Sequence, residues 1–510
     1  MNHLEIDELG KAGRYEELQR CLQAAGYTEQ SICSRLGLRR LADFEMEASR
    51  RPALPAFVDS TDALIRLFLS GDFVEWAALI THLGHVTVAL LGSMGLLKTT
   101  EQGRSYGTVA LYPVDGLLIA SDRWSWPDGS AFEAPPDTVY PALVRNTRLF
   151  LDLLPDDPCE RCLDLGSGTG IAAFMASRNG AKQSWASDIA ERCTRFAEFN
   201  RRLNGLSSVS TVTGDLYGQL QGQTFDRIVA HPPYMPVLAS KWVFLSGGED
   251  GEQITRRIVE GLPQHLEEGG ICCCLTMGTD RKGSDGRDLP FESRVRDWLG
   301  ESQDGFDVAV IVRRLVEPQQ FALSVAPFEP RTRADAHAWR ELFARLGVVS
   351  LVYGFLLIRR RQNRSGPALT LRRVAAPDFG RADWQWLLAW ESAAASGRRS
   401  AILLDSRLYA SRRTEFEVLH GLTDEGWTPQ SYRLRTNSPF DMTCNAEPWA
   451  AQLISQCDGQ ATGRQLLRRF QEQGWIPPDA SENEFADAVT PLISGGFIEV
   501  EAFRPPRAEE

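Results

Sequence analysis

One segment constrains the fold of this chain more than any other, the run of residues 162–176 that reads Cys-Leu-Asp-Leu-Gly-Ser-Gly-Thr-Gly-Ile-Ala-Ala-Phe-Met-Ala. Apolar residues around Asp164 predict a short buried strand, and the apolar run from Ile171 predicts a helix. Between them the chain turns at three residues that tolerate positive φ and let a ligand approach the backbone: Gly166, Gly168 and Gly170. Such a turn is typical of nucleoside-binding α/β folds.

Acidic residues at the ends of three successive predicted strands indicate which nucleoside the turn binds. Asp164 ends the first strand, where a carboxylate repels a pyrophosphate but suits the cationic methionine half of S-adenosylmethionine. Asp188 ends the second strand, where its carboxylate can accept both ribose hydroxyls. Asp215 follows the strand predicted at 209–213, where it can hold an adenine amino group. The expected cofactor site also includes three neighbours of these residues: Ser167, Ile189 and Leu216.

The patterns on either side of this segment predict four parts in an α/β fold. Residues 136–361 alternate strands with helices, which predicts a Rossmann-like domain with a parallel sheet. Residues 1–60 predict a helical region, and residues 61–135 predict helices closed by a β-hairpin, a winged-helix-like pattern. Residues 362–510 predict an α+β accessory region that is winged-helix-like at its end.

The fourth predicted strand adds a narrower motif, Phe-Asp-Arg-Ile-Val-Ala-His-Pro-Pro-Tyr at 225–234. Together with the glycine-rich turn and the three acidic strand ends, it resembles the class I S-adenosylmethionine-dependent methyltransferases. The tetrapeptide resembles the Asn/Asp-Pro-Pro-aromatic signature of amino-methylating enzymes, above all the HemK-like release-factor glutamine N5-methyltransferases and related small-domain methyltransferases. The resemblance implies a seven-stranded methyltransferase domain, S-adenosylmethionine as cofactor, and an acceptor site formed by His231, Pro232 and Tyr234, with His231 also beside the cofactor.

This chain departs from the signature at its first position, which is His231 instead of Asn or Asp. A neutral imidazole accepts one hydrogen bond, and with an ordinary pKa of about 6.5 it can also serve as a general base. His231 is therefore a hydrogen-bond acceptor, a base or a residue that orders the loop. The departure favours methyl transfer to a nitrogen or oxygen of a small molecule or peptide. A protein glutamine or RNA methyltransferase is the alternative, and a non-catalytic cofactor-binding module is a third hypothesis.

Composition narrows the partners and the compartment. The 55 basic and 67 acidic residues give a net charge of −12, without the basic excess that phosphate contacts usually need. We find no uninterrupted apolar run long enough for a membrane helix and no signal-peptide pattern at the start. The ten cysteines form neither a disulfide framework nor a zinc pattern. We therefore expect a cytoplasmic enzyme without a metal or a membrane partner, and the sequence indicates no particular oligomeric state.

Overall fold

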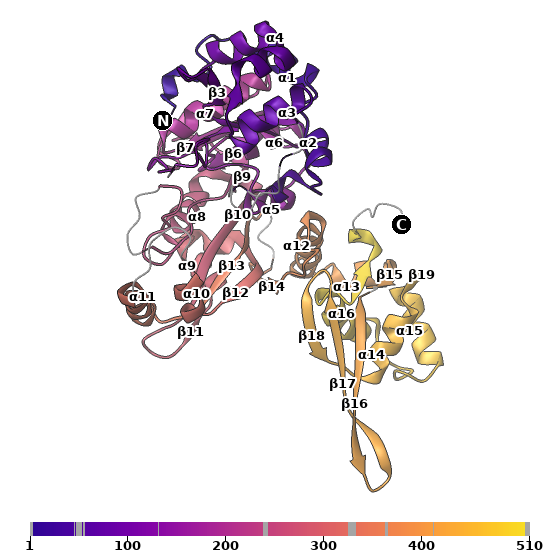
Figure 1. The fold of residues 1–510 in the computed structure, drawn as a ribbon. Coiled ribbons are helices and arrows are strands. Elements are labelled where there is room, and N and C mark those ends of the chain that lie inside the picture. Colours follow the sequence, from indigo (N-terminus) through magenta and orange to yellow (C-terminus); the bar gives the residue numbers. More distant parts are fainter. Residues whose placement is uncertain are drawn as a thin grey trace. The chain divides into compact units, whose positions relative to one another are not determined.

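The computed structural model describes residues 4–44, 46, 54, 57–130, 132–237, 243–324, 333–362, 366–411 and 413–504 (Figure 1). The chain separates into two compact units, Met1–Gly278 and Thr279–Glu510. The boundary falls inside one long strand, β10 (Leu266–Lys282). The four-part division at residues 60, 135 and 361 stays a prediction.

Five parallel strands of a nine-stranded sheet form the centre of the first unit. Their order is β10-β9-β6-β7-β8, and every neighbouring pair among them runs parallel. The expected α/β fold with a mostly parallel sheet is thus confirmed. The bounds of the shorter strands are β6 Arg161–Leu165, β7 Gln183–Asp188, β8 Val209–Thr213 and β9 Phe225–Ala230. The accompanying helices are α5 Arg145–Leu153, α6 Ile171–Arg178, α7 Glu191–Leu203 and α8 Gln253–His265.

Apolar patterning explains why these segments take these forms. Strands β6 and β9 are buried along almost their whole length, as expected for strands covered on both faces of a parallel sheet. Helix α7 instead buries one stripe at helical spacing, which includes Phe196, Asn200 and Leu203. Three polar residues of α7 are also buried, namely Arg192, Thr194 and Asn200.

The N-terminal part of the first unit contains four helices and two small antiparallel sheets. One sheet has the order β1-β3-β2, and the other is the hairpin β4-β5. Because the hairpin forms a sheet of its own, it is separate from the three strands that accompany the helices, and the winged-helix pattern stays a prediction. The bounds are α1 Tyr15–Ala24, α2 Glu29–Leu36, α3 Ser60–Leu64, α4 Trp76–Ser93, β1 Val74–Glu75, β2 Leu97–Thr99, β3 Arg104–Gly107, β4 Ala110–Val114 and β5 Leu117–Ser121.

Helix α4 is more apolar than the sequence reading allowed. Its 18 residues have a mean hydropathy of 1.3, which by length and composition alone would suit a membrane span. The backbone at Gly84 is not helical, with φ 78° and ψ 157°, so two shorter helical segments meet there. Helix α4 also contacts α1, α3 and β2.

Strands β12, β13 and β14 follow β10 along the chain and belong to the same nine-stranded sheet, in the order β14-β12-β13-β10. Strand β12 pairs with β13 in antiparallel and with β14 in parallel orientation, and β11 pairs with the end of β10. The bounds are β11 Asp288–Leu289, α9 Phe291–Trp298, β12 Phe306–Val316, α10 Pro318–Ser324, α11 Arg333–Leu346, β13 Val348–Arg360, β14 Thr370–Val374, α12 Arg381–Ala395 and α13 Arg399–Asp405.

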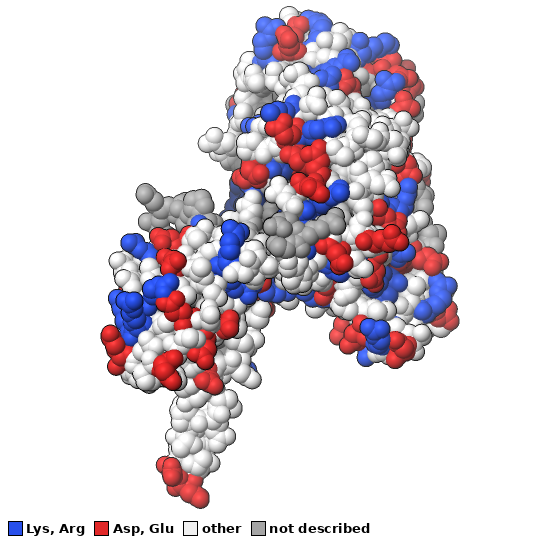
Figure 2. All heavy atoms as spheres, turned by 180° about the vertical axis from the view of Figure 1, so that it is seen from behind, with Lys and Arg blue, Asp and Glu red and all other residues white. Residues whose placement is uncertain are grey.

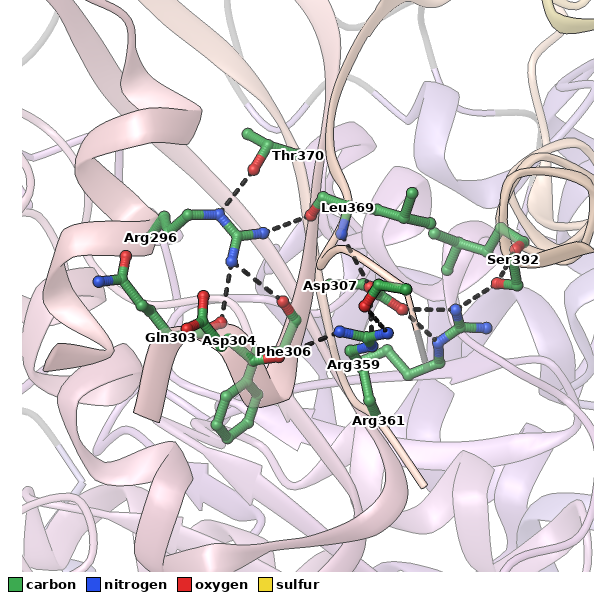
Figure 3. Close-up of polar contacts among 12 residues, drawn as sticks. Arg296, Gln303, Asp304, Phe306, Asp307, Arg359, Arg361, Leu369, Thr370 and Ser392 are labelled. Carbon is green, nitrogen blue, oxygen red and sulfur yellow. Dashed lines mark hydrogen bonds and ion pairs between the residues drawn. The ribbon is translucent and has the colours of Figure 1, made fainter. Parts of the chain in front are cut away.

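A buried carboxylate joins these strands (Figure 3). Asp307 of β12 accepts hydrogen bonds from the guanidinium of Arg359 and from the backbone N–H of Leu369, and it lies 3.8 Å from Arg361 Nε. Nearby, Arg296 donates to backbone oxygens and to Thr370. Because each polar group here has a partner within the fold, we interpret the cluster as structural.

The C-terminal part combines a long hairpin with a small sheet and three helices. Strands β16 and β17 extend as a hairpin, with β18 paired along the base of β17 (Figure 1). A second sheet has the order β19-β15-β20. The bounds are β15 Arg407–Ala410, β16 Thr414–Thr423, β17 Gly426–Asn437, β18 Asp441–Asn445, α14 Pro448–Gln456, β19 Asp458–Thr462, α15 Gly463–Glu472, α16 Glu482–Ser494 and β20 Ile498–Val500.

Candidate functional site

The glycine-rich turn lies between the end of β6 and the start of α6. Gly166, Gly168 and Gly170 have φ values of 70°, 53° and 85°, a region that L side chains rarely adopt. A Cβ atom at Gly166 or Gly168 would meet nothing within 4 Å, so open space lies in front of the turn. At Gly170, by contrast, a Cβ would come within 2.5 Å of the Phe174 ring. The first two glycines therefore leave room for a ligand, and the third allows close packing.

Asp164 is the residue before the last of β6 and lies buried beside the turn. Its side chain is 2% exposed and accepts a hydrogen bond from the Ala173 N–H at 3.2 Å. Burial raises the pKa of Asp164 to about 7, because desolvation disfavours the charged carboxylate. Asp164 therefore ties the strand end to the first turns of α6, and its charge depends on pH near neutrality.

Asp188 connects the glycine-rich turn to helix α7. One carboxylate oxygen accepts the Gly168 N–H and the other accepts the Ala190 N–H, both at 2.9 Å. The Cys193 side chain and the Ile189 N–H also form hydrogen bonds with this carboxylate. Burial raises the pKa of Asp188, although these hydrogen bonds oppose this shift. The next residue, Ile189, is 55% exposed, so it offers an apolar surface beside the carboxylate.

Asp215 and Leu216 follow β8, the strand next to β7. The Asp215 side chain is 50% exposed and forms an ion pair of 2.8 Å with Arg257 of α8. Leu216 has a φ of 50°, one of two positive values among the described non-glycine residues. Such a backbone conformation in a branched residue is uncommon and is concentrated at functional sites.

The sheet order brings these predicted residues together. Strands β6, β7 and β8 are parallel neighbours, so their carboxyl ends, with Asp164, Asp188 and Asp215, lie at one edge of the sheet. In open α/β sheets ligands bind at this edge. Two serine hydroxyls here, those of Ser167 and Ser187, are buried without a hydrogen-bond partner among the described residues.

His231 follows β9, which lies between β10 and β6 in the sheet. Its ring centroid lies 5.3 Å from that of Phe150 on α5 and 5.8 Å from that of Tyr234, nearly parallel to the latter at 16°. Burial lowers the pKa of His231 to about 4. The imidazole is therefore neutral at pH 7, where it can accept or donate one hydrogen bond but is a weak base.

The His-Pro-Pro-Tyr loop has partners on both sides. The Tyr234 hydroxyl accepts a hydrogen bond of 3.1 Å from Asn146 Nδ2, at the start of α5. Pro232 is buried. Beyond the tetrapeptide, the Met235 carbonyl accepts the Gly247 N–H at 2.9 Å, and a Cβ at Gly251 would meet the Tyr234 carbonyl at 2.6 Å. The glycine-rich segment near residue 250 thus packs directly against the loop.

Sequence reasoning missed four residues of this region, because their roles depend on contacts between distant segments. Helix α5 contributes two of them and α7 and α8 one each: Asn146, Phe150, Asn200 and Arg257. Asn200 offered a weak signal in the sequence, because it stands at helical spacing from the apolar residues Phe196 and Leu203.

Comparison with known proteins matches the same region. The family named Methyltransferase small domain covers residues 142–277. Residues 142–277 form a class I methyltransferase domain. The resemblance to HemK-like enzymes is thereby confirmed, and S-adenosylmethionine is the cofactor of the domain. Within the part of the chain that the structure describes, no group of three or more His, Cys, Asp or Glu residues could hold a metal ion.

Several curated relatives are similar to the methyltransferase domain. The Methanocaldococcus jannaschii protein named "Putative protein N5-glutamine methyltransferase MJ0928" is 29% identical over 28% of this chain and 74% of its own length. A release factor glutamine methyltransferase of Moorella thermoacetica is 33% identical over 29% of this chain and 58% of its own. A ribosomal protein uL3 glutamine methyltransferase of Bradyrhizobium diazoefficiens is 31% identical over 24% and 42%. The chain thus spans about half the length of the latter two relatives.

Solved structures of other proteins also match part of this chain. The ribosomal protein L11 methylase of Lactobacillus delbrueckii subsp. bulgaricus covers 40% of this chain and 72% of its own, with 20% identity and a TM-score of 0.23.

The residues of the methyltransferase domain fit its cofactor. The open space in front of Gly166 and Gly168 leaves room for a ligand that touches the backbone. The Asp188 carboxylate at the end of β7 suits ribose hydroxyls, and the Ser167 and Ser187 hydroxyls have no hydrogen-bond partner among the described residues. Ile189 offers an apolar surface for a flat base.

Proposed function

We propose that this chain methylates an amide nitrogen in a polypeptide, with His231, Pro232 and Tyr234 as the acceptor site. The observation that carries the proposal is the neutral, half-buried His231 that follows β9, next to the strand that leads into the glycine-rich turn. The names of the relatives, which refer to glutamine in release factors and in a ribosomal protein, point to the same acceptor class.

The protonation state of His231 favours an amide over an amine. An aliphatic amine is protonated at pH 7 and must lose a proton before its lone pair can attack. A base with a pKa of about 4 cannot hold that proton at neutral pH. An amide nitrogen is already neutral, and it loses one N–H proton as its new N–CH3 bond forms. Because an alkylated amide nitrogen is strongly acidic, this proton can pass to water, so the acceptor needs orientation more than a strong base. One ring nitrogen of His231 can accept a hydrogen bond from the amide N–H and thereby orient the methyl acceptor.

The remaining groups position the reactants. When bound, S-adenosylmethionine supplies the methyl group from its sulfonium. Asp188 and the glycine-rich turn would hold the nucleoside, and Pro232 fixes the backbone between His231 and Tyr234. The Tyr234 ring, whose hydroxyl is held by Asn146, offers a flat surface to a planar amide. Catalysis is then mostly orientation for in-line transfer.

The other acceptors that the sequence leaves open are less well supported. A hydroxyl or ring nitrogen on a small molecule remains the second candidate, because a neutral imidazole also accepts a hydrogen bond from these groups. For RNA the charge distribution is unfavourable: on the face drawn in Figure 2, Lys and Arg are interspersed with Asp and Glu. We propose a cytoplasmic location, in keeping with a polypeptide acceptor.

The test compares wild type with two substitutions at one position. Radiolabelled S-adenosylmethionine is incubated with a cell extract and the chain, and the labelled atom is located by mass spectrometry of the isolated product. We expect label on a side-chain amide nitrogen of a polypeptide. His231→Asn, which keeps a hydrogen-bond acceptor, should retain transfer, whereas His231→Ala should lose about 100-fold. Label in a small molecule or in RNA, or full activity of His231→Ala, would contradict the proposal.

A further inference from the structure

The second unit contains a pocket of about 830 Å³ that the methyl-transfer reaction does not use. One wall is β18, which contributes Met442 and Cys444, two alternate residues on one face of the strand. The opposite wall is α16 and its C-cap, which contribute a stripe at helical spacing: Ala488, Pro491, Leu492 and Gly495. Trp449, in the first turn of α14, also lines the pocket.

The walls of the pocket are mostly apolar, and the polar side chains among them differ in exposure and in hydrogen-bond partners. Asn445 and Glu447 are exposed, so water already solvates them. The Ser494 hydroxyl accepts a hydrogen bond of 2.9 Å from Trp390 Nε1. The cation among the residues that line the pocket is Arg373, on β14. An apolar pocket with few polar groups is typical of small-molecule sites, and its volume lies in their usual range of about 300–1,000 Å³.

The charge of Arg373 is only partly compensated. Its Nη1 donates to the Arg372 carbonyl at 2.9 Å, which carries no net charge. Its Nη2 lies 3.5 Å from Glu391 Oε1, but the same carboxylate is held more closely by Arg399, at 2.6 Å. Two guanidinium groups therefore share one carboxylate. Arg373 Nε is buried without a hydrogen-bond partner among the described residues. Burial lowers the pKa of Arg373, as expected for a cation that has lost water without gaining full compensation.

We propose that this pocket binds a small molecule with an apolar body and one carboxylate, whose carboxylate pairs with Arg373. The apolar body would contact Trp449 and the stripe of α16, and an anion would complete the compensation of the two arginines. The proposal does not depend on the acceptor of methyl transfer, since every residue involved belongs to the second unit.

The test uses the full chain with a matched pair of probes, 4-phenylbutyrate and 4-phenylbutanol, titrated by calorimetry and by tryptophan fluorescence. We expect the acid to bind at least about tenfold more tightly than the alcohol, because a charge-assisted hydrogen bond contributes about that much. Arg373→Gln should reduce the ratio to about one. Equal binding of the two probes by wild type, binding of neither, or an unchanged ratio in Arg373→Gln would overturn the proposal.

Two further variants separate the pocket from the fold. Ala488→Trp places a bulky ring on an exposed position of the α16 wall, so it should abolish binding of both probes while the melting temperature stays near that of wild type. Glu447→Gln removes a carboxylate of the wall and is the matched control for Arg373→Gln. It should keep or increase the affinity for the acid. Unchanged binding by Ala488→Trp would place the probes elsewhere and overturn the proposal, even if Arg373→Gln failed to fold.

Discussion

At the scale of single residues, burial shifts three titratable groups of the methyltransferase site towards their neutral forms. It raises the pKa values of Asp164 and Asp188 and lowers that of His231. A cationic ligand should affect the ionisation of the two aspartates and of His231 differently. Near the glycine-rich turn, a positive charge would favour ionised carboxylates, whereas His231 stays neutral at pH 7 in either case.

Asp164 gives a prediction for the pH dependence of stability. A free aspartate has a pKa of 3.8, and the folded value is about 7. Between these values the folded chain binds a proton more readily than the unfolded chain, so the stabilising contribution is present at low pH and is lost as pH rises through 7. Asp164→Asn, which still accepts the Ala173 N–H, should therefore exceed wild type in stability at pH 8, by at most about 4 kcal/mol.

Thermal unfolding of the unligated proteins at pH 8 and pH 5 measures this difference. The advantage of Asp164→Asn should shrink at pH 5, where wild type also carries a neutral side chain. An equal or larger advantage at pH 5 would show that the Asp164 carboxyl is not the group responsible.

At the scale of elements, local signals predicted the cofactor site better than its supports. Strand β6, the turn at 166–170 and helix α6 could be predicted because each has its own pattern within a few residues. The partners of the loop could not, because they come from afar: Asn146 lies 88 residues before Tyr234, and Asn200 lies 80 residues after Ala120. A single sequence does not indicate which polar side chain forms a hydrogen bond with a group that lies so far away in the chain.

Helix α7 carries two asparagines that bind the hairpin strand β5 in the same way. Asn200 accepts the Ala120 N–H and donates to its carbonyl, and Asn204 does the same for Leu118. The additional hydrogen bond of each side chain differs. Asn200 Nδ2 donates to the Thr169 carbonyl in the glycine-rich turn at 3.1 Å, whereas Asn204 Nδ2 donates to the Asn200 carbonyl at 2.8 Å. Asn200 is therefore a positioning residue for the turn, and Asn204 is its matched control.

We expect Asn200→Ala to weaken binding of S-adenosylhomocysteine about tenfold, because a carbonyl in the turn loses its buried partner. Asn204→Ala should change the affinity less than about twofold, although it also loses contacts to β5. Calorimetric titration gives the affinities, and thermal melts show that both variants are destabilised. Equal affinity losses in the two variants would mean that Asn200 acts only through general stability.

At the scale of the molecule, the N-terminal segments form one compact unit with the methyltransferase domain. A buried ion pair shows how this is achieved: Asp122, which follows β5, binds Arg192 of α7 through both carboxylate oxygens. Asp122 also accepts the Val139 N–H at 2.9 Å, and Arg192 donates to the Leu4 carbonyl. Segments that a boundary at residue 135 would separate thus share one polar network. Periodicity could predict the separate elements but not this network, because the two charges lie 70 residues apart.

This network makes the stability of the first unit depend on a single carboxylate. Asp122→Ala would leave the Arg192 guanidinium, which is 9% exposed, buried without its carboxylate, at a cost of about 3–5 kcal/mol. Replacing both residues by leucine removes the stranded charge, so the double variant should lose less stability than the single one. The exposed pair Glu191–Arg195 on the same helix is the control, and Glu191→Ala should cost less than about 1 kcal/mol. Urea unfolding followed by tryptophan fluorescence measures all three variants. If Asp122→Ala cost no more than Glu191→Ala, the Asp122–Arg192 pair would not be what joins the N-terminal segments to α7.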